Sequence, residues 1–363
     1  MSCLTEIDDP RSPSNGTLHD FREILVMAAA AMLSDCDTVE DIAFWARKKE
    51  TWLRQFLVLK NGIPSEDTFL RIFRALDPKH FEAAFRRWVS GLAGALSGTI
   101  AVDGKTVRGS GSGSESAIHM VSAFATELGV VLGQEKVAEK SNEITAIPAL
   151  LEALYIKGLL VSIDAMGCQK GIARQITDQG GEYLLMVKGN QPTLLAAVET
   201  AFIDAVPIDR HQLAEKSHGR LVVQMASVLP AKGIVDAADW PKCKTIGRID
   251  SVRWVGDRES ALEQRYYISS RDLSAEALAP AVKSHWAIEN RLHWVLDVSF
   301  GEDGSTIRKD NAPQNLSLLK KILLNIIRTD TTHTAKASLR LKRKAAAWDD
   351  EVRMNMLGLS PLC

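Results

Sequence analysis

The stretch LLVSIDAMGCQKGIA, residues 159–173, combines a strand of apolar residues with a carboxylate at its end. Leucine, valine and isoleucine fill most of positions 159–163, which predicts a short buried strand, and Asp164 follows directly. Small, turn-prone residues then lead into a helical pattern that ends at the two glycines 180–181. On its own, Asp164 is interpreted most simply as a cap for the loop after the strand. Whether Asp164 also has a catalytic or metal-binding role depends on the residues next to it in the sheet.

Strand and helix patterns alternate on both sides of this stretch. Three strand patterns, TIAVDGKTVRG (99–109), AIHMVSAFATE (117–127) and VVLGQEKVAEK (130–140), are separated by turns containing Gly and Ser, which predicts a meander. A helical pattern at 142–158 leads into the strand before Asp164, and the helix after it leads into the strand EYLLMVKGN (182–190). Helical crossovers join parallel strands in right-handed units. The order β-β-β-α-β-α-β is therefore that of a ribonuclease-H-like sheet with helices on both faces.

The flanking regions have different patterns from this sheet. Residues 1–97 are mainly helical in spacing and are predicted to form a helical N-terminal domain. Residues 98–200 are predicted to form the first part of the core, and residues 201–270, with three strand-like segments, a β-rich insertion. Residues 271–363 return to helix, complete the core and end in a basic helical tail. The predicted fold class is α/β with a ribonuclease-H-like core.

Charge is unevenly distributed along the chain. The 363 residues carry a net charge of −1, yet between Ser305 and Ala345 ten Lys and Arg residues face two Asp residues, an excess of 10 − 2 = +8. Such an excess is typical of a surface that contacts phosphates, although a solvated helix face would have the same composition. A nucleic-acid site in this chain would therefore be a local patch.

Composition excludes several classes of protein. No run of about 18 apolar residues is present, so we expect no transmembrane helix, and the polar N-terminus differs from a secretory signal. The five cysteines are scattered and lack CxxC spacing, which argues for reduced thiols and against a zinc site built on cysteine. The predicted location is the cytoplasm.

Two aspartates in strand patterns are candidates for a metal site. Asp103 lies within TIAVDGKTVRG, and Asp164 ends the later strand. In the predicted topology these strands are neighbours, so both carboxylates would lie near one place at the sheet, where ligand sites of open α/β sheets gather. Two close carboxylates repel each other unless a cation lies between them, and oxygen ligands suit Mg²⁺ or Mn²⁺.

The segment HWAIENRLHWVLDV contains the strongest candidate for a third acid. His285, Glu289, His293 and Asp297 recur at steps of four, which predicts one shared helical face. A wet stripe of polar side chains would explain the two histidines and Asp297 individually. A zinc site is the less favoured alternative, because the His-Glu-x-x-His order of metalloproteases is absent.

The chain resembles a DDE-type bacterial insertion-sequence transposase, and more narrowly the H-repeat-associated (ISAs-type) group. A helical region ending in GIPSEDTF precedes the core, as in that group. The matching motifs occur in the family's order between about residues 100 and 312: VDGKTVRGS, EKSNEITAIPALLEAL, SIDAMGCQKGIA, YLLMVKGNQPTL, EKSHGR, RYYISS, HWAIENRLHWVLDV and EDGSTIRKDNA. The resemblance implies a transposase that cleaves element ends and transfers them into target DNA.

The resemblance also implies the site residues. Asp103, Asp164 and Glu289 would be the catalytic acids and would hold two Mg²⁺ ions, with Mn²⁺ as a substitute. The partner would be double-stranded DNA, bound by a homodimer, and neither a membrane nor a small-molecule substrate is expected. The protein would associate with the nucleoid when bound to DNA.

One departure from the broader superfamily concerns the residues around the glutamate. The superfamily places a Tyr, an Arg and a Lys at fixed steps, and these steps land here on Val282, His285 and Leu296. His285 is the first candidate to replace the arginine beside the cut. Trp286 is interpreted as a core residue, or alternatively as a stacking platform for an unpaired base. The candidate DNA contacts are Lys105, Arg108, Lys188, Asn190, His285, Trp286 and Arg291.

Two other functions remain as alternatives. A ribonuclease-H-like nuclease would cut DNA without joining it, and a catalytically lapsed relic would only bind DNA. We predict no role for Cys168 or His293.

Overall fold

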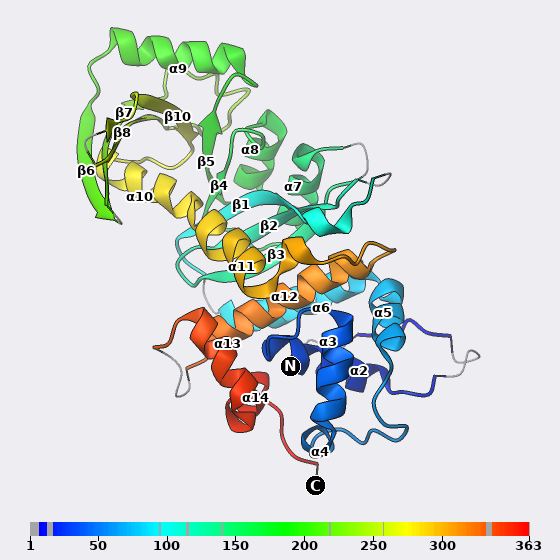
Figure 1. Ribbon diagram of the computed structural model, residues 1–363. Helices are drawn as coiled ribbons and strands as arrows, with labels where there is room; N and C mark the ends of the chain where they lie inside the picture. Colours follow the sequence, from blue (N-terminus) through cyan, green and yellow to red (C-terminus); the bar gives the residue numbers. More distant parts are fainter. Residues whose placement is uncertain are drawn as a thin grey trace.

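The computed structural model in Figure 1 places a long mixed sheet above a cluster of helices that holds both ends of the chain. It describes residues 7–12, 17–93, 96–113, 116–138, 141–217, 219–256, 258–331 and 336–362. Cys3 and Cys363 lie outside these ranges, and Cys36, Cys168 and Cys243 are free thiols. Among the described residues, none of the helices combines the length and the apolar character that a bilayer span requires.

The N-terminal region is helical, as predicted. Its helices begin at capping side chains: Asp20 accepts from two backbone amides of α2, and Thr38 forms a capping box with Asp41 in α3. The helices are α2 (Phe21–Leu33), α3 (Val39–Lys48), α4 (Glu50–Leu53), α5 (Glu66–Ala75) and α6 (Pro78–Ala93). Their apolar faces form one core that continues into the sheet region.

The central strands have the predicted order. The sheet runs β3-β2-β1-β4-β5, with β1 antiparallel to β2 and parallel to β4. The strands are β1 (Thr99–Thr106), β2 (His119–Ala125), β3 (Val130–Lys136), β4 (Leu160–Ile163) and β5 (Glu182–Val187). The crossover helices are α7 (Glu143–Glu152) and α8 (Lys170–Asp178), and the 3-10 turn η2 (Arg108–Ser110) follows β1. The predicted α/β class with a ribonuclease-H-like strand order is confirmed.

The strands of the insertion extend this same sheet. Strand β10 pairs antiparallel with β5, with Tyr266 opposite Val187, and the order continues β10-β8-β7-β6. The elements are α9 (Pro192–Asp204), β6 (Asp209–Ser217), β7 (Arg220–Pro230), β8 (Thr245–Val255), β9 (Arg258–Glu259) and β10 (Glu263–Ser269). The region is β-rich, as expected, and it curves away from the core as the upper lobe of Figure 1. The predicted domain boundaries stay a prediction.

The C-terminal helices return to the core and cross it. In Figure 1, α12 passes between the sheet and the N-terminal helices, and the Asn325 side chain donates to and accepts from the backbone of Val131 on edge strand β3, at 2.8 Å each. This contact covers a strand edge that would otherwise be open. The elements are α10 (Ala275–His285), the π-helical turn η3 (Glu289–His293), α11 (Trp294–Phe300), η4 (Glu302–Gly304), α12 (Ala312–Thr329), α13 (Leu339–Trp348) and α14 (Asp350–Leu357).

The basic run at residues 305–345 is only partly on the surface, which corrects the prediction of one phosphate-facing surface. Lys320, Lys321, Lys342 and Arg343 are buried. Arg343 contacts the Met32 carbonyl, for example, and Lys342 Nζ donates to the carbonyls of Ile327 and Asp330. These cations satisfy buried acceptors from distant segments, so much of the local excess is internal.

Candidate metal centre

Two adjacent parallel strands bring the first two acids to one edge of the sheet. Val102 on β1 lies opposite Ile163, the last residue of β4; Asp103 follows Val102 within β1, and Asp164 follows directly after β4. The apolar residues before them are buried, so both backbones are held by the core. The predicted neighbourhood of these two carboxylates therefore follows from strand register.

The third acid lies on an irregular helix. Helix α10 ends at His285, and Glu289 begins the π-helical turn η3, whose last residue is His293. Such turns insert a residue into a helix and are frequent at functional sites. Glu289 and His293 face Asp103, and Asp297 forms an ion pair with Lys105, two residues further along the same strand.

Three side chains form a compact cluster. Nδ1 of His293 lies 3.5 Å from Oδ2 of Asp103 and 3.5 Å from Oε2 of Glu289. Within the described part of the chain, Asp103, Glu289 and His293 each offer one ligand atom, and these atoms lie within 4.8 Å of one another. Sequence reasoning gave His293 no role, although its four-residue spacing from Glu289 was the signal for its place here.

The cluster carries excess negative charge in a buried setting. Burial raises the pKa of Asp103, and the neighbouring carboxylates of Glu289 and Asp164 raise it further. The imidazole of His293 lowers the pKa of Glu289, against the opposing effect of partial burial. A buried carboxylate beside other carboxylates is stabilised by a cation, so the cluster has the electrostatics of a cation site.

Asp164 lies beside this cluster and caps the loop that follows β4. Its Oδ1 accepts hydrogen bonds from the backbone amides of Met166 (3.0 Å) and Gly167 (3.2 Å). It is not among the three residues whose ligand atoms lie within 4.8 Å of one another. The interpretation of Asp164 as a cap for the loop is therefore correct. Its charge also raises the pKa of Asp103.

Lys105 lies on the same strand as Asp103 but is engaged by carboxylates. Its Nζ lies 2.7 Å from Asp297, 3.1 Å from Glu302 and 2.9 Å from Asp303. Burial lowers the pKa of Lys105, but these carboxylates, Glu302 first, outweigh it and hold the pKa above its ordinary value. The prediction that Lys105 contacts DNA phosphate is wrong for this arrangement, because three anions surround its ammonium group.

The other predicted phosphate contacts differ in their surroundings. Arg108 has a side chain that is 82% exposed, with only a 3.6 Å approach to Asp303, and Lys188 is also exposed. The Asn190 amide instead donates to the Ala165 carbonyl at 2.7 Å and braces the loop after Asp164. Arg108 and Lys188 are therefore free to meet a phosphate, whereas one side of Asn190 is used internally.

The two candidate DNA contacts at the end of α10, His285 and Trp286, differ in their surroundings. His285 is buried against the backbone of Ser162 on β4, burial lowers its pKa, and its Nδ1 has no hydrogen-bond partner among the described residues. Trp286 is 40% exposed, with the Arg265 guanidinium 5.3 Å from its ring centroid. The interpretation of Trp286 as a core residue is therefore wrong.

Arg291 is an exposed residue whose guanidinium reaches the end of β2. Its Nη1 donates to the Thr126 carbonyl at 2.7 Å, and its guanidinium lies 5.6 Å from the Phe124 ring centroid. These contacts pin the turn η3 to β2. These contacts indicate a structural role for Arg291, and its predicted contact with DNA stays a prediction.

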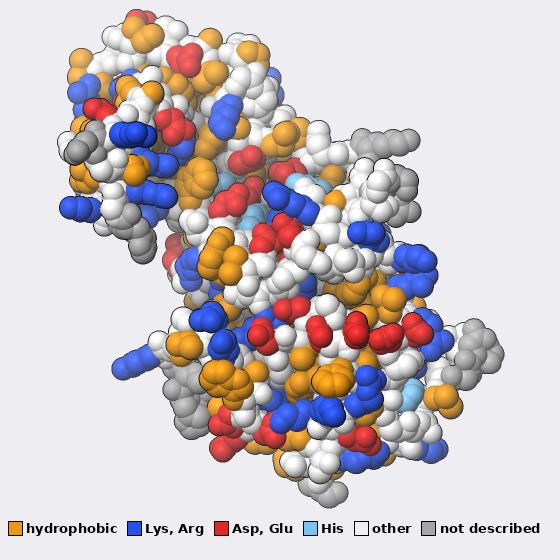
Figure 2. All heavy atoms as spheres, viewed as in Figure 1, with side chains coloured by type: hydrophobic (Ala, Val, Ile, Leu, Met, Phe, Trp, Pro, Cys, Tyr) orange, Lys and Arg blue, Asp and Glu red, His pale blue; other side chains and the backbone are white. Residues whose placement is uncertain are grey.

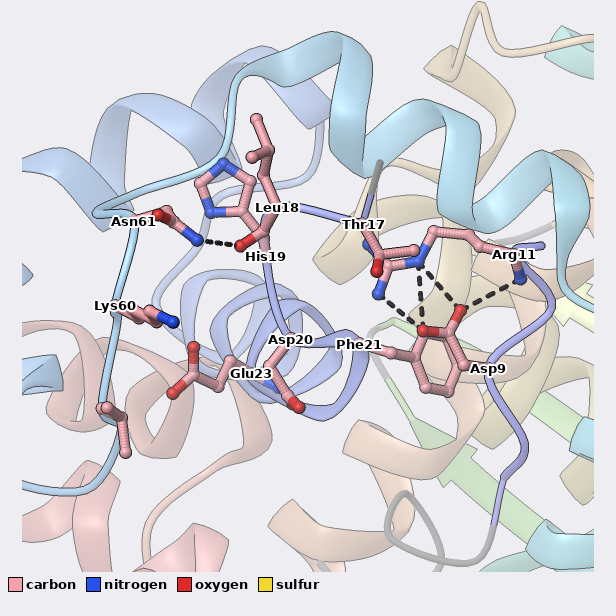
Figure 3. A pocket seen from close by; sticks show the side chains of 11 residues that line it. Asp9, Arg11, Thr17, Leu18, His19, Asp20, Phe21, Glu23, Lys60 and Asn61 are labelled. Atoms are coloured by element: carbon pink, nitrogen blue, oxygen red, sulfur yellow. Dashed lines mark hydrogen bonds and ion pairs between the residues drawn. The ribbon is translucent and has the colours of Figure 1, made fainter. Parts of the chain in front are cut away.

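A separate pocket lies in the N-terminal region. Figure 3 shows Asp9 and Arg11 paired within it, with Nη2 of the arginine 2.6 Å from Oδ2 of the aspartate, and Asn61 donating to the Leu18 carbonyl. The pocket has a volume of about 480 Å³ and shares no lining residue with the carboxylate cluster. Asp9 and Arg11 pair with each other, and Asp20 and Glu23 accept from backbone amides, so these groups are used within the N-terminal region.

Comparison with known proteins matches nearly the whole chain. A family model described as "Transposase DDE domain" matches residues 95–326, and a second, "DDE_Tnp_1-associated", matches residues 1–89. The "H repeat-associated putative transposase YhhI" of Escherichia coli K12 is 39% identical over 356 residues, covering 95% of this chain and 94% of that protein. The "Putative transposase YncI" of Escherichia coli O157:H7 is 40% identical over 341 residues, covering 91% and 87%.

Several solved structures are similar to this chain. A piggyBac transposase, in a synaptic complex with hairpin DNA, aligns with a TM-score of 0.47 and 12% identity, covering 98% of this chain and 77% of that one.

Proposed function

The chain belongs to the DDE transposase family, and from that premise we propose that it cleaves DNA at the ends of an insertion sequence and joins the ends to target DNA. The family identified from the motifs is thus confirmed. The observation that carries the proposal is the cluster of Asp103, Glu289 and His293 ligand atoms within 4.8 Å of one another, with Asp164 on the adjacent strand.

The residues present fit a divalent cation. Asp103 has a side chain only 12% exposed and lies within 3.5 Å of an imidazole, beside two further carboxylates that raise its pKa. Oxygen-rich sites of this kind suit Mg²⁺ and Mn²⁺. We propose that Asp103, Asp164 and Glu289 hold two Mg²⁺ ions. When bound, such ions supply charge neutralisation at the phosphoryl oxygens and a water of lowered pKa.

The protein holds the three carboxylates in fixed positions for this chemistry. Asp103 comes from the central strand β1, and Asp164 and Glu289 come from the neighbouring strand end and the helix that crosses it. We propose that these carboxylates orient a water molecule in line with the scissile P–O3′ bond, so that cleavage releases a 3′-hydroxyl. That hydroxyl then attacks a target phosphorus, and a target 3′-oxygen leaves. Fixed geometry favours such in-line displacements.

DNA would approach from the face that Figure 2 presents. Acidic and histidine side chains gather at its centre, and Lys and Arg side chains lie on the insertion beside them. Exposed Arg108 and Lys188 would contact phosphates, which position a duplex without reading its sequence. The Trp286 ring, with Arg265 over it, would stack on an unpaired base near the cut. A homodimer on paired ends and association with the nucleoid stay predictions.

A joining assay tests this proposal. The full chain is incubated with a duplex carrying the DNA that flanks its gene, Mg²⁺ and a supercoiled target plasmid. We expect cleaved ends and plasmid molecules carrying a covalently joined end. Cleavage without joined product would instead identify a nuclease, and binding without either product would identify a lapsed relic.

A further inference from the structure

His293 is the member of the cluster to which the proposed chemistry assigns no task. We propose that the His293 imidazole is itself a ligand of the divalent ion, so that the centre is a mixed nitrogen–oxygen site instead of an all-carboxylate one. This inference rests on the proposed function, because it names a further ligand of the same centre.

The first support is the distance of the ring nitrogen from the carboxylate oxygens. Nδ1 of His293 lies 3.5 Å from an oxygen of Asp103 and 3.5 Å from an oxygen of Glu289. Ligand atoms held about 2.1 Å from one ion lie roughly 3 to 4 Å from each other. The His293 nitrogen therefore has the spacing, from both carboxylates, of a ligand that shares a centre with them.

The second support is the condition of the imidazole. The His293 side chain is only 7% exposed. A well-formed N–H···O hydrogen bond has a length of about 2.7–3.2 Å, so both contacts of Nδ1 are long. Nε2 is buried and has no hydrogen-bond partner among the described residues. A buried ring with only long contacts at Nδ1 is costly, and an ion bound at Nδ1 would supply a strong partner for that nitrogen.

The third support is the rigidity of the element that carries it. His293 closes the turn η3, and the buried side chains of Leu292 and Leu296 anchor this segment in the core. Arg291 fixes the turn to the Thr126 carbonyl on one side, and the Asp297–Lys105 ion pair fixes α11 to β1 on the other. Pre-organised ligands lose little freedom on binding an ion.

A nitrogen ligand changes which ions the centre prefers. Imidazole suits first-row transition metals, whereas Mg²⁺ prefers oxygen ligands. The His293 ligand therefore raises the affinity for Mn²⁺ relative to Mg²⁺. His285 provides the comparison residue, because it is also a buried histidine near these acids but is not among the clustered ligands.

Pulsed EPR on the full chain loaded with Mn²⁺ alone tests the ligand directly. We expect ¹⁴N hyperfine coupling from an imidazole in the wild type and in His285→Gln, and loss of that coupling in His293→Asn. The Mn²⁺ affinity of His293→Asn should fall about tenfold, with a smaller change for Mg²⁺. Circular dichroism checks that each variant is folded.

The wild-type spectrum alone can contradict the inference. The test therefore gives a result even if a variant fails to fold. Bound Mn²⁺ without imidazole coupling, or coupling that persists in folded His293→Asn, contradicts the His293 ligand. If either result is obtained while the wild type still joins DNA ends, the proposed function stands without a His293 ligand. If the coupling depends on His293 but no DNA is cut, the ligand stands and the proposed function fails. Absence of any Mn²⁺ binding contradicts both.

Discussion

Lys105 on β1 and Asp297 on α11 form an ion pair of 2.7 Å that joins the strand bearing Asp103 to the helix that continues from Glu289. Glu302 and Asp303 meet the same ammonium group at 3.1 and 2.9 Å. Lys105 is thus a positioning residue: it touches none of the three clustered ligands, yet it sets the distance between the elements that carry them.

Replacing Lys105 by Met should therefore disturb both stability and the metal centre. The change leaves the buried Glu302 carboxylate without this cation, which costs about 3 to 5 kcal/mol of unfolding free energy. We expect DNA cleavage to fall about 10- to 100-fold and Mn²⁺ affinity to fall with it. Denaturant titration, cleavage rates and Mn²⁺ titration measure these effects.

The surface ion pair of Lys170 with Asp239 supplies the control for this change. Lys170→Met should cost less than about 1 kcal/mol and leave cleavage unchanged. If Lys105→Met matched wild type in stability and Mn²⁺ affinity, the positioning role would be refuted.

Arg291→Ala should destabilise the fold without weakening DNA binding directly. The lost hydrogen bond to the Thr126 carbonyl and the lost contact with the Phe124 ring together cost about 1 to 3 kcal/mol. Denaturant titration measures the loss, and anisotropy of a labelled duplex measures DNA affinity. Weaker DNA binding with unchanged stability would restore Arg291 as a DNA contact.

Trp286→Leu should weaken binding of cleaved element ends. Stacking of a base on an aromatic ring is worth about 1 to 3 kcal/mol, so we expect roughly a tenfold or larger rise in Kd at fixed salt. Trp348 is the matched control, because it is also exposed and carries the Lys344 ammonium 5.6 Å from its ring centroid. Equal effects of Trp286→Leu and Trp348→Leu on fluorescence anisotropy would contradict a specific role for Trp286.

Glu82→Gln should flatten the pH dependence of stability. Glu82 on α6 is buried, and burial raises its pKa from 4.5 to about 8 against the opposing charges of Arg86 and Lys321. The folded chain therefore keeps a proton that the unfolded chain releases near pH 4.5. The resulting stability is complete below that pH and is lost as the pH rises to about 8.

We therefore expect the free energy of unfolding of the wild type to fall between pH 5 and 8 relative to Glu82→Gln, by about 1 to 3 kcal/mol. Urea titrations at several pH values measure the difference, and Glu66→Gln, at an exposed position, serves as control. Parallel pH profiles for wild type and Glu82→Gln would show that Glu82 is ionised in the folded protein.

The strands and the first two acids were predictable because their signals are local. Apolar runs define β1 and β4, and the crossover between them makes their neighbourhood follow from chain order. The ion pairs of Lys105 were not predictable, because its carboxylate partners lie almost 200 residues further along the chain. The π-helical turn has no residue signature in this chain, so the irregularity of the helix between Glu289 and His293 was not predicted.

The burial of several cations in the basic tail was also not predictable from the sequence. Charge counting cannot distinguish a lysine in solvent from Lys321, which is buried and bonded to Gln134 and Ser317. The contact with Gln134 spans 187 residues of sequence, and only folding brings the two side chains together.

Cleavage of DNA carrying the element's own ends, with Mg²⁺, tests whether Glu289 completes the catalytic centre with Asp103 and Asp164. Wild type should release a 3′-hydroxyl at the element end, and Glu289→Gln should give no product, because it removes one carboxylate of the centre. Glu276→Gln, an exposed change on α10, should cut like wild type. If Glu289→Gln cuts as well as wild type, Glu289 is not the third acid and the account of the site is wrong.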